Sequence, residues 1–299
     1  MTTSTHLGPA GPSTVGSSSN TAAPGTVGPR EYFLGHSDSE TRRLMLQHQL
    51  YAPITRRLFE AAGIGRGMRV LDVGSGAGDV SLLLADLVGP SGQVIGIDQN
   101  DAILKTARAR ADAAGWRTIT FRHGDIWNIS DLAGLDAVVG RWILMHIAEP
   151  AALIQQLATL LRPGGIIAFQ DSDFTYPPRM FPELPLASRV HQIMLPRQIP
   201  GGPQIAMGSG LFKAFLDAGL PAPQIRVETT MGGGPDWPGY EYLAETLRSL
   251  LPMIQRFAPD DLADLDIDTL AARLRDEAIT HDAVQMLPLV VGAWTRKEA

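Results

Sequence analysis

The chain of 299 residues contains no cysteine. This absence excludes disulfides, thiolate nucleophiles, zinc ribbons and iron–sulfur clusters, and leaves His, Asp and Glu as the only candidate metal ligands. Basic residues are also scarce, since 25 Lys and Arg stand against 31 Asp and Glu for a net charge of −6. Without an excess of positive charge to neutralise phosphates, we expect no nucleic acid as the main partner.

Two further absences concern the compartment. The N-terminus lacks a basic stretch followed by an apolar run, and nowhere do about 18 apolar residues run together. We therefore expect neither a signal peptide nor a membrane span, and a soluble cytoplasmic protein. At roughly 150 residues per domain, the length allows one large α/β domain, or one domain with an elaborated cap.

The first 30 residues have low complexity. Twenty-three of them are Gly, Pro, Ser, Thr or Ala, and none is acidic. Such a composition buries too little apolar surface to offset the entropy of ordering, so we interpret residues 1–30 as a disordered tail. Residues 31–62 are expected to form an N-terminal helical lid, because apolar side chains recur at helical spacing from Glu40 to Ala62. Pro53 should break or kink this segment into two helices.

Short β-branched runs alternate with amphipathic stretches in residues 63–299, a pattern typical of parallel strands joined by crossover helices. It predicts an α/β fold with a doubly wound, mostly parallel, seven-stranded sheet and cap insertions at about 172–208 and 231–284. The prolines between positions 177 and 203 argue against a regular βα unit in the first insertion. The expected strands are Arg69–Val73, Gln93–Ile97, Thr118–Arg122, Asp136–Gly140, Gly165–Gln170, Gln224–Thr230 and Leu287–Trp294. The expected helices are Asp79–Val88, Asp101–Ala114, Pro150–Leu161, Ser209–Ala218, Tyr240–Gln255 and Asp260–Ala278.

A glycine cluster follows the first expected strand. The run from Val70 to Gly78 reads VLDVGSGAG, directly before an expected helix. Glycines there let a ligand approach bare backbone, with the amides of the helix start pointing at it. The run lacks the Gly-Lys-Ser/Thr ending of a Walker loop, and Asp79 stands where a dinucleotide fingerprint has its third glycine.

Two carboxylates follow the neighbouring strands. Asp98 ends the second strand 24 positions after Gly74, where a carboxylate can accept hydrogen bonds from a ribose diol. Asp125 follows the third strand at the same edge of the sheet, where it can accept a hydrogen bond from the exocyclic amine of adenine. Two carboxylates in this arrangement with the glycine cluster are a much stronger signal than either one alone.

With these motifs the chain resembles the class I S-adenosylmethionine-dependent methyltransferases, which implies a Rossmann-like sheet and S-adenosylmethionine as cofactor. The resemblance runs from about Val70 to Gln170, and Leu161–Gly165 is similar to a later signature of the family. It implies that Gly74, Ser75 and Gly76 line the methionine moiety, Asp98 the ribose, Gln99 the adenine face, Asp125 and Ile126 the adenine edge, and Arg141 the cofactor's polar end. Structural roles compete for Asp72, which can brace the loop, and for Arg141, which can pair with a surface acid.

Methyl transfer from a sulfonium is an in-line displacement, so holding the acceptor ~3 Å from the methyl group supplies much of the acceleration. A base adds roughly 10²-fold to 10⁴-fold where the acceptor carries a proton. Tyr32 in the lid and His146 after the fourth strand are the candidate catalytic residues, with hydrophobic packing and a structural hydrogen bond as their competing roles. His191 is expected at the surface. No metal site is predicted, the nearest approach being the acidic pair at positions 171 and 173.

We therefore expect a methyltransferase that acts on a small aromatic or heteroaromatic metabolite. The layout, with the Gly-Gly-Gly-Pro-Asp run at 232–236, is similar to bacterial natural-product methyltransferases, and C-methylation of an indole ring is the sharper hypothesis. O- or N-methylation of a related metabolite and a non-catalytic cofactor-binding module are the alternatives. The expected partner is a small-molecule acceptor, with no nucleic acid and no membrane; the oligomeric state is left open, a homodimer included.

Overall fold

The computed structural model describes residues 38–129, 131–194, 203–262 and 265–298. The predicted disordered tail, residues 1–30, and the candidate catalytic residue Tyr32 lie outside the described residues. None of the helices in the described ranges is long and apolar enough to cross a membrane.

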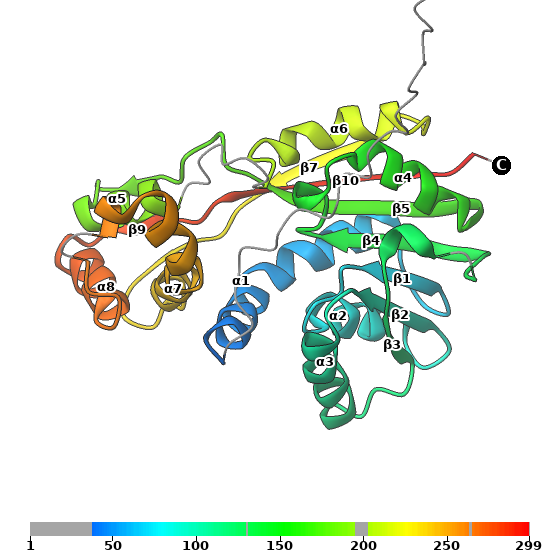
Figure 1. The fold of residues 1–299 in the computed structure, drawn as a ribbon, viewed down its shortest axis with the longest axis horizontal. Helices are drawn as coiled ribbons and strands as arrows, with labels where there is room; N and C mark the ends of the chain where they lie inside the picture. The colour runs from blue at the N-terminus through cyan, green and yellow to red at the C-terminus, as the bar shows by residue number, and fades with distance from the viewer. Residues whose placement is uncertain (1–37, 130, 195–202, 263–264, 299) are drawn as a thin grey trace, which may run out of the picture.

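A seven-stranded sheet forms the body of the molecule (Figure 1). Its order is β3-β2-β1-β4-β5-β10-β7; β10 runs antiparallel to both neighbours and the other pairs are parallel. Strand order reverses between β1 and β4, and doubly wound sheets bind ligands at such a switch point. The predicted doubly wound, mostly parallel, Rossmann-like sheet is thereby confirmed. Its strands are β1 (Arg69–Val73), β2 (Gln93–Asp98), β3 (Ile119–His123), β4 (Leu135–Arg141), β5 (Leu161–Asp173), β7 (Gln224–Glu228) and β10 (Leu289–Arg296).

Helices cover both faces of this sheet (Figure 1). On one face lie α1 (Asp38–Ala62), α2 (Asp79–Val88) and α3 (Asp101–Ala113), and on the other lie α4 (Pro150–Thr159) and α6 (Met207–Asp217). Alternate residues of each strand serve the two faces. In β1, for example, Val70 packs in the core under α1 and α2, whereas Leu71 packs in the core under α4 and α6.

The cap lies at one end of the molecule and has a small sheet of its own (Figure 1). Strands β6 (Met180–Phe181), β9 (Val284–Met286) and β8 (Met231–Gly233) pair antiparallel in this order. The cap helices are α5 (Pro185–Met194), α7 (Gly239–Phe257) and α8 (Leu270–Thr280), and short 3₁₀ turns stand at η1 (Ile126–Asn128), η2 (Leu144–His146) and η3 (Pro259–Leu262). Side chains of α1 complete the apolar core that these cap helices share.

Pro53 lies inside α1, which is one helix and not the two that were predicted. Residues on both sides of Pro53 are buried: Tyr51 and Ile54 belong to the cap core, and Leu58 and Phe59 pack against the large sheet. This packing offsets the backbone hydrogen bond that a proline removes from a helix, because most helical stability in proteins comes from tertiary burial.

In the first insertion a helix that was not predicted, α5, forms among the prolines. Pro185 is the first residue of α5, a position at which the missing N–H costs nothing. In the second insertion, the helix predicted from Asp260 begins only at Leu270. Before it, the Asp266 carboxylate binds the Asp268 N–H (3.0 Å) and the hydroxyl of Thr269 (2.8 Å), a local arrangement that competes with helix.

β5 is longer than the predicted Gly165–Gln170, because residues 161–164 also form strand, and Leu161 begins this strand instead of ending the preceding helix. Lateral contacts hold this segment, since Arg162 Nε donates to Asp136 Oδ1 (2.7 Å) and the Gly164 N–H donates to the Lys297 carbonyl (3.0 Å). At its other end β5 continues to Asp173, so the predicted acidic pair lies within the strand.

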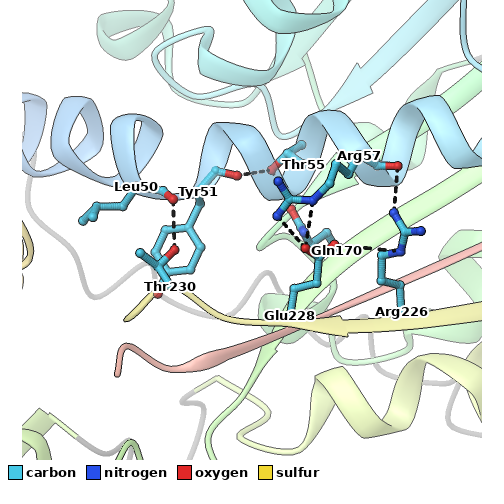
Figure 2. Close-up of polar contacts among 8 residues, drawn as sticks. All are labelled: Leu50, Tyr51, Thr55, Arg57, Gln170, Arg226, Glu228 and Thr230. Carbon is cyan, nitrogen blue, oxygen red and sulfur yellow. Dashed lines mark hydrogen bonds and ion pairs between the residues drawn. The ribbon is translucent and has the colours of Figure 1, made fainter. Parts of the chain in front are cut away.

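Polar contacts fasten α1 to the sheet along its length (Figure 2). Gly292 of β10 allows the close approach, because it leaves room for the buried side chain of Leu58. The contacts are hydrogen bonds from Thr230 to the Leu50 carbonyl (3.0 Å), from Thr55 to Gln170 (2.7 Å) and from Arg226 to the Arg57 carbonyl (3.1 Å), and the ion pair of Arg57 with Glu228.

Gly292→Ala should therefore destabilise the fold by about 1–3 kcal/mol, the usual range for overpacking. A Cβ at position 292 would lie 2.5 Å from Cδ1 of Leu58, which has no solvent to move into. Urea titration measures the free energy of unfolding. Gly65→Ala is the control, because a Cβ there meets no atom within 4 Å. Equal stability of the two variants would contradict the close seating of α1 on β10.

Candidate cofactor-binding site

The glycine loop joins β1 to α2 at the switch point of the sheet. Gly74, Gly76 and Gly78 have φ angles of 70°, 51° and 85°, a region that glycine adopts without strain. The N–H groups of Gly74 and Ser75 both donate to the Ile97 carbonyl at 2.9 Å, so the loop closes over the end of β2. The loop therefore presents bare backbone at the carboxyl edge of the sheet, as the sequence predicted.

Asp98 stands at the end of β2, beside this loop. Its Oδ2 accepts the Gly76 N–H at 2.9 Å, and its Oδ1 accepts the Asn100 N–H at 2.9 Å. Each carboxylate oxygen has a second lone pair that can accept a hydroxyl hydrogen. The arrangement suits a ribose diol, the role that the resemblance implied for Asp98.

The loops after β2 and β3 lie next to each other, because Asp98 and His123 are paired in register. Gln99 and Asp125 are exposed there, and Ile126 is half-buried against the core. Asp125 caps η1 by accepting the Trp127 N–H (3.0 Å), and the Gln99 carbonyl contacts Nε2 of His123 (3.0 Å). The structure thus brings the residues proposed for adenine to one edge of the sheet.

Arg141 ends β4 and is buried, so it does not pair with an acid at the surface. Its Nη1 donates to the Thr55 hydroxyl (3.2 Å), and its guanidinium lies 4.8 Å from the ring centroid of Trp142. Burial lowers the pKa of Arg141, an effect that the negative charges of Asp79 and Asp72 oppose. Within the described part of the chain only Thr55 accepts a hydrogen bond from this guanidinium, and a buried guanidinium with N–H donors to spare suits the carboxylate of a ligand.

Three buried polar atoms around the glycine loop have no hydrogen-bond partner among the described residues: Asp72 Oδ1, Ser75 Oγ and His48 Nδ1, the last 3.9 Å from Asp79 Oδ1. Leaving such a group unsatisfied costs about 1–3 kcal/mol. Burial also raises the pKa of Asp72 to about 7, although its other oxygen accepts the Ser81 hydroxyl at 2.6 Å. Unsatisfied polar atoms beside bare glycine backbone fit a polar ligand such as the methionine end of S-adenosylmethionine.

His146 lies in η2, in the loop that leaves the same end of β4 as Arg141, and is half-buried. The backbone N–H of His146 donates to the Ile143 carbonyl at 3.0 Å. The neighbouring Met145 N–H donates to Asp171 Oδ1 (3.2 Å), which fixes the turn to β5. Burial raises the pKa of Asp171 to about 8.

The acidic pair of β5 has structural partners. Asp173 accepts the Ser209 N–H (2.8 Å) and the Thr175 N–H (3.0 Å), and so ties β5 to the start of α6. Among the described residues, no three His, Asp or Glu side chains are grouped as a metal site requires.

An aromatic cluster at the junction of cap and sheet escaped the sequence analysis. Trp142 has φ 54°, unusual for a bulky residue, and its Nε1 donates to the Ser172 hydroxyl (2.7 Å). The Tyr51 ring meets Trp142 edge-on at 5.0 Å and Tyr242 at 6.0 Å. The spacing of Tyr51 in α1 showed only that it faces a core, and no sequence signal links it to Tyr242 of α7.

The expectation for His191 was wrong. Its ring is buried in the cap, where Nε2 contacts the amide of Gln285 at 2.9 Å. Burial lowers the pKa of His191 to about 4. The ring therefore belongs to the interior of the cap and not to its surface.

Known proteins resemble this chain in the region that contains the glycine loop. A family profile described as a methyltransferase domain matches residues 64–198. Arsenite methyltransferase of Aquipseudomonas alcaligenes is 34% identical over 113 residues, 35% of this chain and 33% of the relative. Nocamycin O-methyltransferase of Saccharothrix syringae is 33% identical over 120 residues, 40% of this chain and 43% of the relative. The chain thus spans less than half the length of either curated relative.

Among solved structures, a candidate methyltransferase of Bacillus halodurans C-125 matches with a TM-score of 0.51 at 18% identity. The match covers 81% of this chain and 98% of that one, and supports the fold. The profile match includes the glycine loop, Asp98, Asp125 and Arg141. Residues 64–198 thus match a methyltransferase domain, and the chain is similar to the class I S-adenosylmethionine-dependent methyltransferases, whose cofactor is S-adenosylmethionine.

Proposed function

We propose that the protein transfers a methyl group from S-adenosylmethionine to a small aromatic or heteroaromatic metabolite. The observation that carries this proposal is the arrangement at the switch point, where the glycine loop is bonded to Asp98 on one side and the buried Arg141 has no anionic partner in the described residues. The cofactor supplies a methyl group made electrophilic by a sulfonium. The protein's part is to orient cofactor and acceptor and to exclude water.

The proposed cofactor contacts follow the edge of the sheet. The Asp98 carboxylate accepts hydrogen bonds from the ribose hydroxyls, and the Arg141 guanidinium binds the methionine carboxylate. The remaining contacts are Gly74, Ser75 and Gly76 at the methionine moiety, Gln99 at the adenine face, and Asp125 with Ile126 at the adenine edge.

An aromatic acceptor is supported by the cluster of Tyr51, Trp142 and Tyr242, which stands where the cap meets the end of β4. We propose C-methylation of an indole ring as the specific reaction, with Tyr32 or His146 accepting the ring proton. O-methylation is the second candidate, favoured by the similarity to nocamycin O-methyltransferase, which also supports a setting in natural-product biosynthesis.

Incubation with S-adenosylmethionine and a panel of indoles, phenols and aromatic amines should release S-adenosylhomocysteine with at least one acceptor. Mass spectrometry and NMR of the product identify the methylated atom and so decide between carbon, nitrogen and oxygen. Tight cofactor binding without release on any acceptor would instead favour a binding module.

Asp98→Ala and Arg141→Gln should each weaken binding of S-adenosylhomocysteine about 10-fold to 150-fold, because a charge-assisted hydrogen bond contributes roughly 1.5–3 kcal/mol. Calorimetry with 5′-methylthioadenosine, which keeps the ribose but lacks the amino acid, separates the two roles. Asp98→Ala should lose affinity for both ligands, and Arg141→Gln only for S-adenosylhomocysteine. Equal losses for both ligands in Arg141→Gln would reject its carboxylate contact; thermal unfolding of each variant checks the fold.

Tyr32→Phe and His146→Ala, assayed separately at saturating cofactor, should show which residue takes the acceptor's proton. The variant that lacks this residue should lose on the order of 10²-fold in kcat with little change in KM. If His146 is the acceptor, kcat should also fall as the pH is lowered, because protonated imidazole accepts no proton. Near-native kcat in both variants would leave proximity alone as the mechanism.

A further inference from the structure

β7 is the edge strand of the large sheet, and no strand of the described residues pairs with its outer side. Arg226 and Glu228 point toward α1, where both contact Arg57. Because side chains alternate along a strand, Ile225 and Val227 point to the opposite face, where they are 42% and 56% exposed. The strand contains no proline or lysine, and its two charged residues, Arg226 and Glu228, lie on the side of α1, so the opposite face of the edge has no charged side chain to protect it.

Ile225 and Val227 continue an apolar face that is buried elsewhere. In the register of β7 and β10, Ile225 lies opposite Ala293 and Val227 opposite Val291. Both β10 residues belong to the core beneath α6, which packs on β5 and β10. The core surface of the sheet therefore extends sideways onto β7 and is uncovered there in the described part of the chain.

The flank of α6 adds two apolar side chains to this surface. Gly208 of α6 faces β10, because a Cβ there would lie 3.0 Å from Cγ2 of Val291. Phe212 and Leu216 follow Gly208 by one and two helical turns and lie on the same flank. They are 43% and 44% exposed, and α6 runs beside β7 (Figure 1). We name the four side chains Phe212, Leu216, Ile225 and Val227 the edge patch.

We propose that the edge patch binds a second copy of this chain, with the two β7 strands paired antiparallel about a two-fold axis at Val227. In this register Arg226 lies opposite the partner's Glu228, and the partner's Arg226 lies opposite Glu228. A two-fold axis at Arg226 would instead oppose two like charges, and one at Ile225 would place no basic side chain of the partner opposite Glu228. Within its own chain Glu228 pairs with Arg57, and its Oε1 lies 3.8 Å from Arg226 Nε. This register adds the partner's Arg226 to that network, so charge complementarity favours a second copy paired in this register.

Such a pairing would also bury the exposed apolar side chains of the edge patch. An antiparallel pair about an axis perpendicular to the sheet keeps matching faces together, so the two Val227 side chains meet on the face that α6 covers. The α6 helices of both copies then flank this seam, and Phe212 and Leu216 of each close over it. The free backbone N–H and C=O groups of both edges gain partners in the same contact.

Cysteine cross-linking tests the register, since the chain has no cysteine of its own. In a Val227→Cys variant the two thiols would lie directly opposite, with Cα atoms about 4.5–5.5 Å apart, which a disulfide can span. Mild oxidation should therefore give a covalent dimer on a non-reducing gel. Ile225→Cys is the matched control on the same face, because the register separates its two copies by about 13 Å along the strands.

Sedimentation of the full chain tests the association itself. The wild type should show twice the monomer mass of 32.1 kDa. Val227→Lys should restore the monomer, because it places two lysine side chains opposite each other at the two-fold axis. It should not lower the melting temperature, because Val227 is exposed in the single chain. Met231→Lys, 55% exposed on the cap sheet, should remain dimeric. A monomeric wild type up to ~100 µM, dissociation by Met231→Lys but not Val227→Lys, or equal cross-linking at positions 225 and 227 would overturn the proposal.

Discussion

The burial of α1 in two cores at once is the constraint on which the rest of the structure depends. Tyr51 and Ile54 pack among the cap helices, while Leu58 and Phe59 pack against the large sheet. Between them, Thr55 bonds to Gln170 of β5 and to Arg141 at the end of β4. One helix therefore sets the position of the cap relative to the sheet and shields the guanidinium from water. The electrostatic attraction between this guanidinium and a ligand carboxylate is therefore stronger than it would be in water, because the protein interior screens the two charges less.

The carboxyl edge of the sheet was largely predictable because its signals are local. The glycine run, Asp98 and Asp125 each follow a strand, and parallel strands of one sheet bring such positions to the same edge. The burial of Arg141 could not be predicted in the same way, because it depends on Thr55, which lies 86 residues earlier in the chain. The contact of Tyr51 with Tyr242 has the same limitation. Periodicity shows that a side chain faces a core, and packing alone decides which core.

The errors in the secondary structure have identifiable physical reasons. Prolines were interpreted as ending regular structure, yet Pro53 is held within α1 by burial on both sides and Pro185 begins α5. Ahead of α8, hydrogen bonds accepted by the Asp266 side chain take the place of the backbone hydrogen bonds of a helix. In each case a tertiary contact or a side-chain hydrogen bond outweighed the intrinsic preference of the residue.

The cap sheet has a consequence for how the chain folds. Its strands β6 and β9 pair Met180 with Gln285, so a contact within the cap closes a loop of more than a hundred residues. That loop contains β7. Because β5 ends just before β6 and β10 begins just after β9, the pairing of β5 with β10 closes the same loop. Contacts this distant in sequence form slowly, because closing the loop between them costs conformational entropy before the contact contributes any favourable free energy. β10 pairs with β5 across a still longer stretch of chain, for example Leu289 with Asp173, so the cap sheet and the β5–β10 side of the large sheet both depend on contacts between distant segments.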